Sequence, residues 1–377
     1  MSSDREQDQA VPTDDERWRG KTSPRLTKKR TSNTEVLANV LLVFIPLAVV
    51  GVLYGLGPVF IFTCSGLSCV VLSYRLGQAT EALSVRLGPV SGGLLNATFG
   101  NAAELIISIM ALSHGLFLLV RTTLIGSILG QLLLVLGTSL LAAGLKHKDL
   151  GFSRSLVQIN VTLMVIAMIA IGLPSLLSTA ASAQGNASAS FLAPALATLL
   201  IIIYGCAVTF SVRGQPKEQG DGSSPRWTLP KGLLVLATST GGIVLVSELL
   251  VSSVLPFVAS TGVSQVFIGL ILIPIFSNVV DHMVAISVAL KNRMDLSLTI
   301  SVGSAAQVAC LVLPIIVVVG VAMGQPTGLI FTPIELSTLA AALLLMVPVL
   351  LDGKSNWLEG AQLLTCYLIL ALVLWTL

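Results

Sequence analysis

The stretch NATFGNAAE, from Asn96 to Glu104, places an acid and two asparagines in the middle of a long apolar run. The run from Leu94 to Gly115 is long enough to cross a bilayer, and Glu104 is its single formal charge. A charged side chain inside a bilayer costs about 2.5 kcal/mol or more on insertion scales, so such residues are rare and mostly functional. The stretch therefore predicts a functional site within the membrane; the alternative is an acid in a helix–helix contact.

The same pattern returns 177 positions later, inside a second apolar run. The matched pairs are Phe99 and Phe276, Asn101 and Asn278, Glu104 and Asp281, Gly126 and Gly303, and Ser127 and Ser304. Gly100 is expected to loosen the first run, and Pro274 to interrupt the second. Weak internal symmetry with interrupted hydrophobic segments is typical of transporters whose binding site lies between two repeats.

The composition excludes a soluble protein. The 377 residues are 54% hydrophobic and only 10% charged, whereas soluble domains carry about 25% charged residues. The five cysteines lie in apolar spans without metal-type spacing, so they are expected to be buried hydrophobes. The sequence contains no His-Glu-x-x-His, Gly-x-Ser-x-Gly or phosphate-loop motif. We therefore expect an all-α polytopic membrane protein that is not an enzyme, needs no cofactor and binds no nucleic acid.

Hydropathy predicts about 11 transmembrane helices. They are placed near residues 36–54, 57–74, 91–114, 120–144, 156–177, 191–211, 232–256, 265–289, 297–323, 331–351 and 358–377. The expected organisation is a disordered cytosolic tail (1–35), a leading transmembrane helix (36–56), a first five-helix repeat (57–211), a cytosolic linker (212–231) and a second five-helix repeat (232–377).

The distribution of Lys and Arg predicts the orientation of these spans. With the amino terminus in the cytosol, Arg121 is the single one of the 21 basic residues that falls on the other side. The carboxyl terminus then faces the lumen or the exterior. The spans that carry the repeated motif, 91–114 and 265–289, are five apart and cross in opposite directions. The two repeats are therefore expected to be inverted, an architecture that supports alternating access.

Glu104 and Asp281 are expected to meet near the axis that relates the repeats. Two carboxylates in a medium of low dielectric constant must be neutralised by a divalent cation or by protons. Together with the amides of Asn101 and Asn278 they form a set of hard oxygen ligands that suits calcium. Five further polar residues either line the site and its pathway or pack between helices: Ser127, Ser304, Gln131, Gln307 and His282. His282 is a candidate proton relay or a structural histidine.

Three segments resemble the repeats of the calcium/proton (cation/proton) exchanger family, vacuolar type, of the calcium/cation antiporter superfamily. They are GGLLNATFGNAAELIISIMAL (92–112), GSILGQLLLVLG (126–137) and FIGLILIPIFSNVVDH (267–282). The resemblance implies that Glu104 and Asp281 bind calcium and protons in turn. It also implies that Glu81 and Glu248 line the paths to the site, and that the membrane is vacuolar.

The second repeat departs from the family pattern. It has SNVVDH at 277–282 where the family usually has Gly-Asn-Ala-Ala-Glu-His, and Gly130-Gln131 replaces the usual Ser-Asn in the first repeat. The expected function is an antiporter that exchanges cytosolic calcium for lumenal protons. Two alternatives stay open: the same fold moving manganese or sodium, and a diverged membrane sensor or scaffold that transports nothing. A homo-oligomer is also possible.

Overall fold

The computed structural model describes residues 33–147, 150–181, 189–214, 227–325 and 331–376. Nearly all of the tail expected at 1–35 and most of the linker expected at 212–231 lie outside the described residues. The chain divides into two units, residues 1–37 and residues 38–377.

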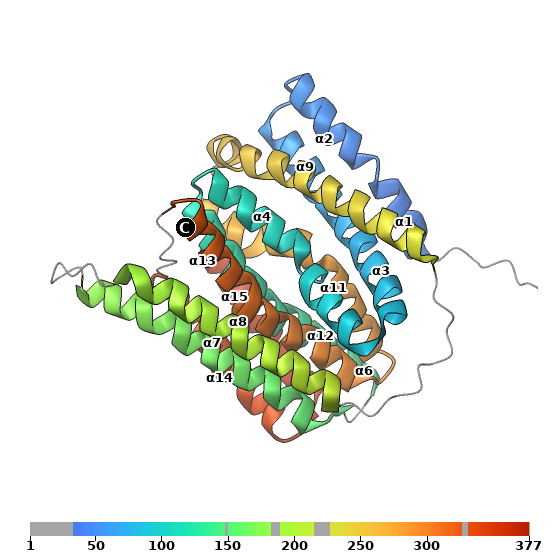
Figure 1. Ribbon diagram of the computed structural model, residues 1–377, viewed down its shortest axis with the longest axis vertical. Coiled ribbons are helices and arrows are strands. Elements are labelled where there is room, and N and C mark those ends of the chain that lie inside the picture. Colours follow the sequence, from blue (N-terminus) through green and yellow to red (C-terminus); the bar gives the residue numbers. More distant parts are fainter. Residues whose placement is uncertain (1–32, 148–149, 182–188, 215–226, 326–330, 377) are drawn as a thin grey trace, which may run out of the picture. The chain divides into compact units, whose positions relative to one another are not determined.

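The described chain is almost entirely helical (Figure 1). The first half contains α1 (Asn33–Leu41), α2 (Phe44–Leu53), α3 (Pro58–Phe99), α4 (Ala102–Ser113), α5 (Phe117–Leu129), the π-helical η1 (Gly130–Val135), α6 (Leu136–Lys146), β1 (Leu150–Gly151), α7 (Arg154–Ala181) and α8 (Ala189–Gly214). The second half contains α9 (Leu229–Thr261), α10 (Gln265–Phe267), the π-helical η2 (Ile268–Leu272), α11 (Ile273–Ala289), α12 (Met294–Gln307), the π-helical η3 (Val308–Val312), α13 (Leu313–Ala322), α14 (Pro333–Leu351), β2 (Lys354–Ser355) and α15 (Trp357–Trp375).

Ten helices in the described residues are long and apolar enough to cross a membrane, and they match ten of the predicted spans. The remaining span, predicted at 91–114, differs from the expectation. Gly88 has φ +80° and bends α3, and the chain is interrupted again at Asn101, where φ is −112° and ψ is 26°. The segment is therefore the end of α3 followed by the shorter α4. Gly88 adopts its positive φ readily because it carries no side chain.

The π-helical segments η1 and η3 occupy equivalent positions in the two repeats, each just after a Gly-Ser pair. Proline accounts for two of the three π segments, since Pro274 follows η2 and Pro314 follows η3. A proline cannot donate its backbone hydrogen bond and clashes with the preceding turn, so a wider turn relieves the conflict. The second motif span thus continues as a helix through Pro274, where the sequence predicted an interruption.

Glycines let several helices approach closely. A Cβ on Gly137 of α6 would lie 3.0 Å from the carbonyl oxygen of Gly360 of α15, and a Cβ on Gly360 would lie 2.8 Å from that of Gly137. Gly126 of α5 faces the backbone of Leu270 in the same manner. Small residues at contacts are typical of helices in membranes, where lipid is as apolar as leucine and close packing drives association.

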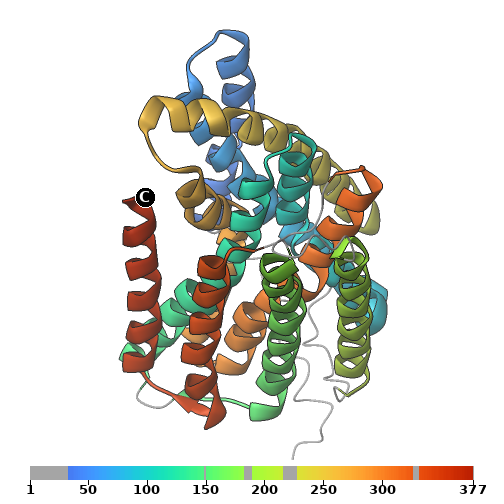
Figure 2. The same ribbon diagram turned by 90° about the vertical axis from the view of Figure 1, so that its left-hand side faces the viewer.

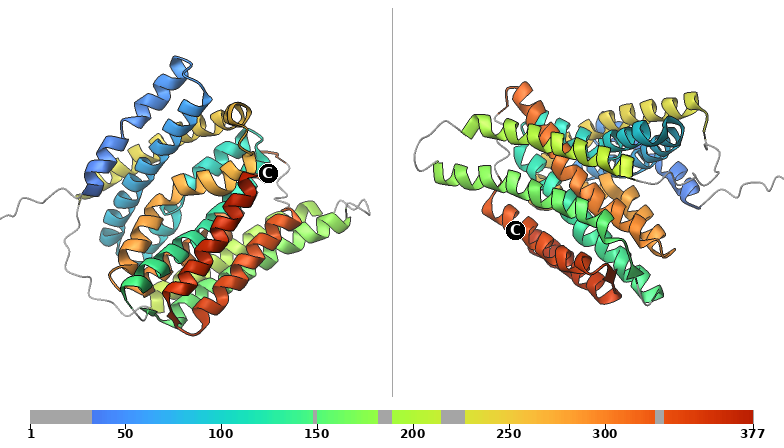
Figure 3. Two further views of the ribbon diagram at one scale, coloured as in Figure 1. Left: turned by 180° about the vertical axis from the view of Figure 1, so that it is seen from behind. Right: turned by 60° about the horizontal axis from the view of Figure 1, so that its bottom comes forward.

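Helices and strands that are far apart in the sequence pack together in the fold. α2, α3 and α9 pack together (Figure 3), and α14 lies beside α7 (Figure 2). The short strands β1 and β2 pair antiparallel, with Leu150 opposite Ser355. This pairing joins the connection between α6 and α7 to the connection between α14 and α15.

Candidate functional site

The two repeated acids lie near one another, one in each half of the chain. Glu104 lies in the first turn of α4 and is 1% exposed, and Asp281 lies in α11 and is half-buried. They are close enough to interact electrostatically, and Ser127 lies beside Glu104. Among the described residues, however, neither oxygen of the Glu104 carboxylate has a well-formed hydrogen bond. A buried carboxylate in this condition is costly unless a proton or a cation neutralises it.

Two hydrogen bonds cross between the repeats. Asn278 Nδ2 donates to Ser127 Oγ at 3.1 Å, and Ser304 Oγ donates to Asn101 Oδ1 at 3.4 Å. Because Asn101 corresponds to Asn278 and Ser127 to Ser304, each contact is the image of the other under the repeat. This reciprocity is the signature of a two-fold relation. The structure thus brings together four residues that the sequence paired only by spacing.

Asp281 has two side-chain donors, a serine like the one beside Glu104 and an amide. Ser304 Oγ lies 3.0 Å and Gln131 Nε2 lies 3.3 Å from Asp281 Oδ2. The Ser304 hydroxyl has one proton, so it bonds either Asp281 or Asn101 at any moment. Gln131 also reaches Ser304 Oγ at 3.3 Å. The repeat counterpart of Gln131 is Val308, so no equivalent amide reaches Glu104 from that position.

Two other predicted residues lie close to this cluster in the chain or in space. Gln307 is buried, and a Cβ on Gly100 would lie 3.8 Å from its Nε2, so Gln307 stands beside the break between α3 and α4. His282 follows Asp281 and is half-buried. In the described part of the chain no hydrogen bond joins His282 to Asp281, and its role as a proton relay stays a prediction.

Glu81 and Glu248 are both exposed. Glu248, in α9, bonds the imidazole of His114, whose Nε2 lies 2.9 Å from Oε1 and 3.1 Å from Oε2. His114 was not among the predicted site residues. The chain has three histidines, and His114 stands at the end of α4, the helix that carries Glu104. This position could have indicated a functional role. The pathway roles of Glu81 and Glu248 remain predictions.

The side chains that could bind a metal ion at this site offer oxygen atoms, and two of these side chains are carboxylates. Within the described residues no group of three or more His, Cys, Asp or Glu side chains could hold a metal ion. Calcium takes about six to eight oxygen ligands. A calcium ion between Glu104 and Asp281 would therefore rely on neutral amide and hydroxyl oxygens, backbone carbonyls and water.

The family model for the sodium/calcium exchanger protein matches residues 57–213 and 231–376. A Ca(2+)/H(+) antiporter of Aphanothece halophytica is 38% identical over 88% of this chain and 94% of its own length. The vacuolar calcium ion transporter of Schizosaccharomyces pombe is 32% identical over 89% of this chain and 83% of its own length.

Solved structures that resemble this chain also include calcium/proton exchangers. The structure of native YfkE has a TM-score of 0.78 at 36% identity and covers 90% of this chain and 100% of its own. The H+/Ca2+ exchanger CAX has a TM-score of 0.73 at 16% identity, covers 90% of this chain and 88% of its own, and shows the shared fold. These likenesses confirm the resemblance drawn from the motifs and the all-α membrane fold. The chain belongs to the sodium/calcium exchanger protein family, whose members similar to it include calcium/proton antiporters of bacteria and vacuolar cation/proton exchangers.

Proposed function

We propose that this protein is a secondary active antiporter that exchanges calcium for protons at Glu104 and Asp281. The observation that carries the proposal is the pair of repeat-related acids, flanked by the crossed contacts of Asn278 with Ser127 and of Ser304 with Asn101. The names of relatives at 38% identity, which are Ca(2+)/H(+) antiporters, support the choice of ions.

Competition for the same carboxylates would couple the two fluxes. Glu104 and Asp281 interact electrostatically and Glu104 is buried, so a site emptied of both calcium and protons holds repelling charges in a medium of low dielectric constant. Such an empty site is costly, and it disfavours a change of access without cargo. Protons would release calcium on the acidic side, and calcium would displace protons on the cytosolic side.

The calcium ligands would come from both repeats. Glu104 and Asp281 would supply the charge, and the side chains of Asn101 and Asn278 would supply neutral oxygen atoms. Two carboxylates balance one divalent cation. A set with few protein charges suits a site that must release its ion again, because transport requires binding that is weak enough to reverse.

We further propose that the two halves, 57–211 and 232–377, move against each other in alternating access. The two separately matched family segments support this division. Contacts between the segments that connect the helices support the predicted orientation of the chain in the membrane. Lys146 Nζ donates to the carbonyl of Leu290 at 2.9 Å, and the pairing of β1 with β2 brings Gly151 beside Lys354. These connections carry basic residues and would lie together on the cytosolic side. Vacuolar relatives make a vacuolar membrane the proposed location.

A second candidate is the same mechanism acting on manganese or sodium. The observation in its favour is the second acid, because the side chain of Asp281 is one methylene shorter than that of Glu104. In addition, Ser304 and Gln131 both donate hydrogen bonds to one oxygen of Asp281. Uptake of radioactive calcium in the presence of each competing ion would separate the two candidates. A lower inhibition constant for manganese or sodium than for calcium would favour this second one.

The test is radioactive calcium uptake into proteoliposomes with an acid interior. Uptake should collapse when the pH gradient is dissipated, and Glu104→Gln should abolish it. Ser108→Ala is the matched control, because Ser108 is buried one turn further along α4 and carries no charge. Exchange at the parent rate by Glu104→Gln would refute the proposal.

A further inference from the structure

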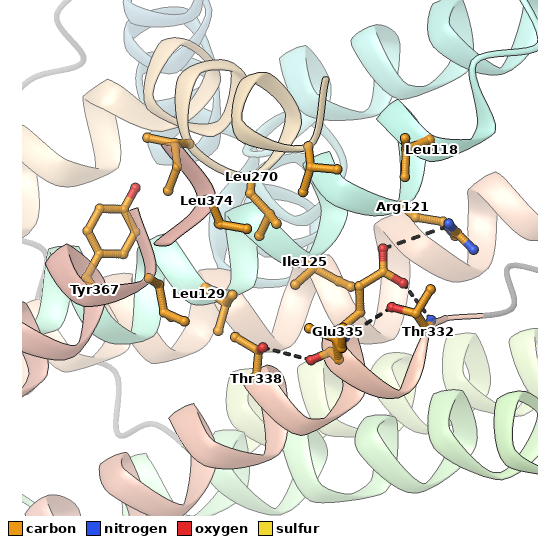
Figure 4. A pocket seen from close by; sticks show the side chains of 14 residues that line it. Leu118, Arg121, Ile125, Leu129, Leu270, Thr332, Glu335, Thr338, Tyr367 and Leu374 are labelled. Atoms are coloured by element: carbon orange, nitrogen blue, oxygen red, sulfur yellow. Dashed lines mark hydrogen bonds and ion pairs between the residues drawn. The ribbon is translucent and has the colours of Figure 1, made fainter. Parts of the chain in front are cut away.

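An apolar cavity of about 220 Å³ lies between α5, η2, α14 and α15 (Figure 4). None of the predicted site residues lines it. Its walls include Ile125, Leu129, Leu270 and Leu370. An apolar cavity of about 150 Å³ is already large enough to bind benzene. This one is larger and is surrounded by helices that span the membrane, where lipid chains are the abundant apolar molecules.

The length of the cavity matches one leaflet. Leu118, Ile125 and Leu129 lie on one face of α5, and eleven residues of helix rise about 16 Å. The hydrocarbon core of a bilayer is about 30 Å thick, so the cavity extends through about half of it. Leu118 is close to the start of α5, and Leu129 is the last residue of that helix. The cavity therefore runs from one membrane interface towards the bilayer centre.

Polar groups stand at one end of the cavity. Arg121 Nε lies 3.9 Å from Glu335 Oε1, while the other oxygen of Glu335 accepts from the backbone N–H of Thr332 at 2.7 Å. Figure 4 shows these three residues together, with Tyr367 at the opposite end. Both oxygens of Glu335 are engaged, by Arg121 and by Thr332. Arginine is well suited to phosphate, so Arg121 is the group at this end that complements the phosphate of a phospholipid headgroup.

The rim joins the cavity to the outer surface. Ile334 contributes to the lining and is 77% exposed. Ile334 lies between Thr332 and Glu335, so this opening is at the polar end of the cavity, where an acyl chain would enter and leave its headgroup outside. We propose that the cavity holds one acyl chain of a phospholipid from the leaflet that borders Arg121. The chain would fill the space beside the close contact of Gly126 with Leu270, which joins α5 to η2.

The proposal is tested on the purified full chain in detergent, with dioleoyl phosphatidylcholine added. Native mass spectrometry should show one retained phospholipid per chain, and the lipid should raise the melting temperature. Leu370→Trp fills the cavity and should reduce retention at least tenfold. Leu372→Trp is the matched control on the same helix, because Leu372 is 68% exposed and lies outside the cavity. It should retain phospholipid as the parent does.

Two results would overturn the proposal: equal retention by Leu370→Trp and the parent, or no retained phospholipid in the parent. If the parent retains no lipid but forms dimers, and Leu370→Trp disrupts these dimers, the cavity would instead be assigned to contact with a second copy of the chain. If Leu370→Trp does not fold, the proposal is tested on the unmodified chain with two lipids of different chain length. Dihexanoyl phosphatidylcholine, with its short chains, should stabilise it much less than the dioleoyl lipid, and equal stabilisation by both would exclude an acyl-chain site.

Discussion

Glu104 and Asp281 occupy equivalent positions in the two repeats, but their surroundings differ. Glu104 follows a break between α3 and α4, at a helix amino terminus, where the helix dipole favours negative charge. Asp281 lies within the continuous helix α11 and is held by the side chains of Ser304 and Gln131. Each acid has a serine beside it, but Glu104 alone of the two stands at a helix amino terminus, and Asp281 alone of the two has the amide of Gln131. The comparison teaches that a symmetric pair of acids need not share one mode of stabilisation.

Removing the charge of Asp281 would break the comparison most severely. In Asp281→Asn we expect calcium uptake to fall about 100-fold or more, because one of the two charges of a bound calcium ion would be left without a carboxylate in a medium of low dielectric constant. Uptake into proteoliposomes measures the effect. Asp295→Asn, an exposed acid in the first turn of α12, is the control and should be neutral. Uptake by Asp281→Asn within twofold of the parent would mean that Glu104 works alone.

Removing the amide of Gln131 would make the two acids more alike. A hydrogen bond to a charged group contributes about 1.5–3 kcal/mol, so in Gln131→Leu protons should compete better with calcium at Asp281. We expect the pH midpoint of calcium uptake to rise by about one unit. The measurement is the initial uptake rate as a function of external pH. An unchanged midpoint would show that the Gln131 contact is not formed in the transporting state.

Lengthening the second acid tests the comparison in the opposite direction. Asp281→Glu restores the reach of the carboxylate towards Glu104, and we expect the apparent affinity for calcium relative to manganese to rise about three- to tenfold, or about 1 kcal/mol. Competition of the two ions for uptake measures the ratio. A ratio that falls would indicate that the shorter aspartate is matched to calcium.

The crossed serines should give the smallest effects. Ser127→Ala and Ser304→Ala each remove one hydroxyl, and a neutral hydrogen bond contributes about 0.5–1.5 kcal/mol. We expect a two- to tenfold loss of apparent calcium affinity, larger for Ser304→Ala because Ser304 also accepts a hydrogen bond from Gln131. Affinity measured from the concentration dependence of uptake distinguishes them. Equal losses would remove the asymmetry between the repeats.

The sequence predicted the helical membrane fold and nearly all of its spans. Hydropathy suffices for this, because backbone groups in lipid must be satisfied within each helix and only long apolar segments can do so. The spacing of 177 residues also indicated which polar residues correspond between the repeats. Spacing alone could not show the continuity of the helix through Pro274, since a π-helical turn can absorb a proline.

By itself, the sequence determined the class of protein, the positions of the apolar helices and the pairing of Glu104 with Asp281. Only the tertiary structure decided that Gln131 supports Asp281, that His114 bonds Glu248, and that Arg121 and Glu335 border a cavity. The physical reason is the range of the interactions. Hydropathy and repeats act along the chain, whereas a side-chain contact across more than a hundred residues depends on how each helix is rotated and where it crosses its neighbour.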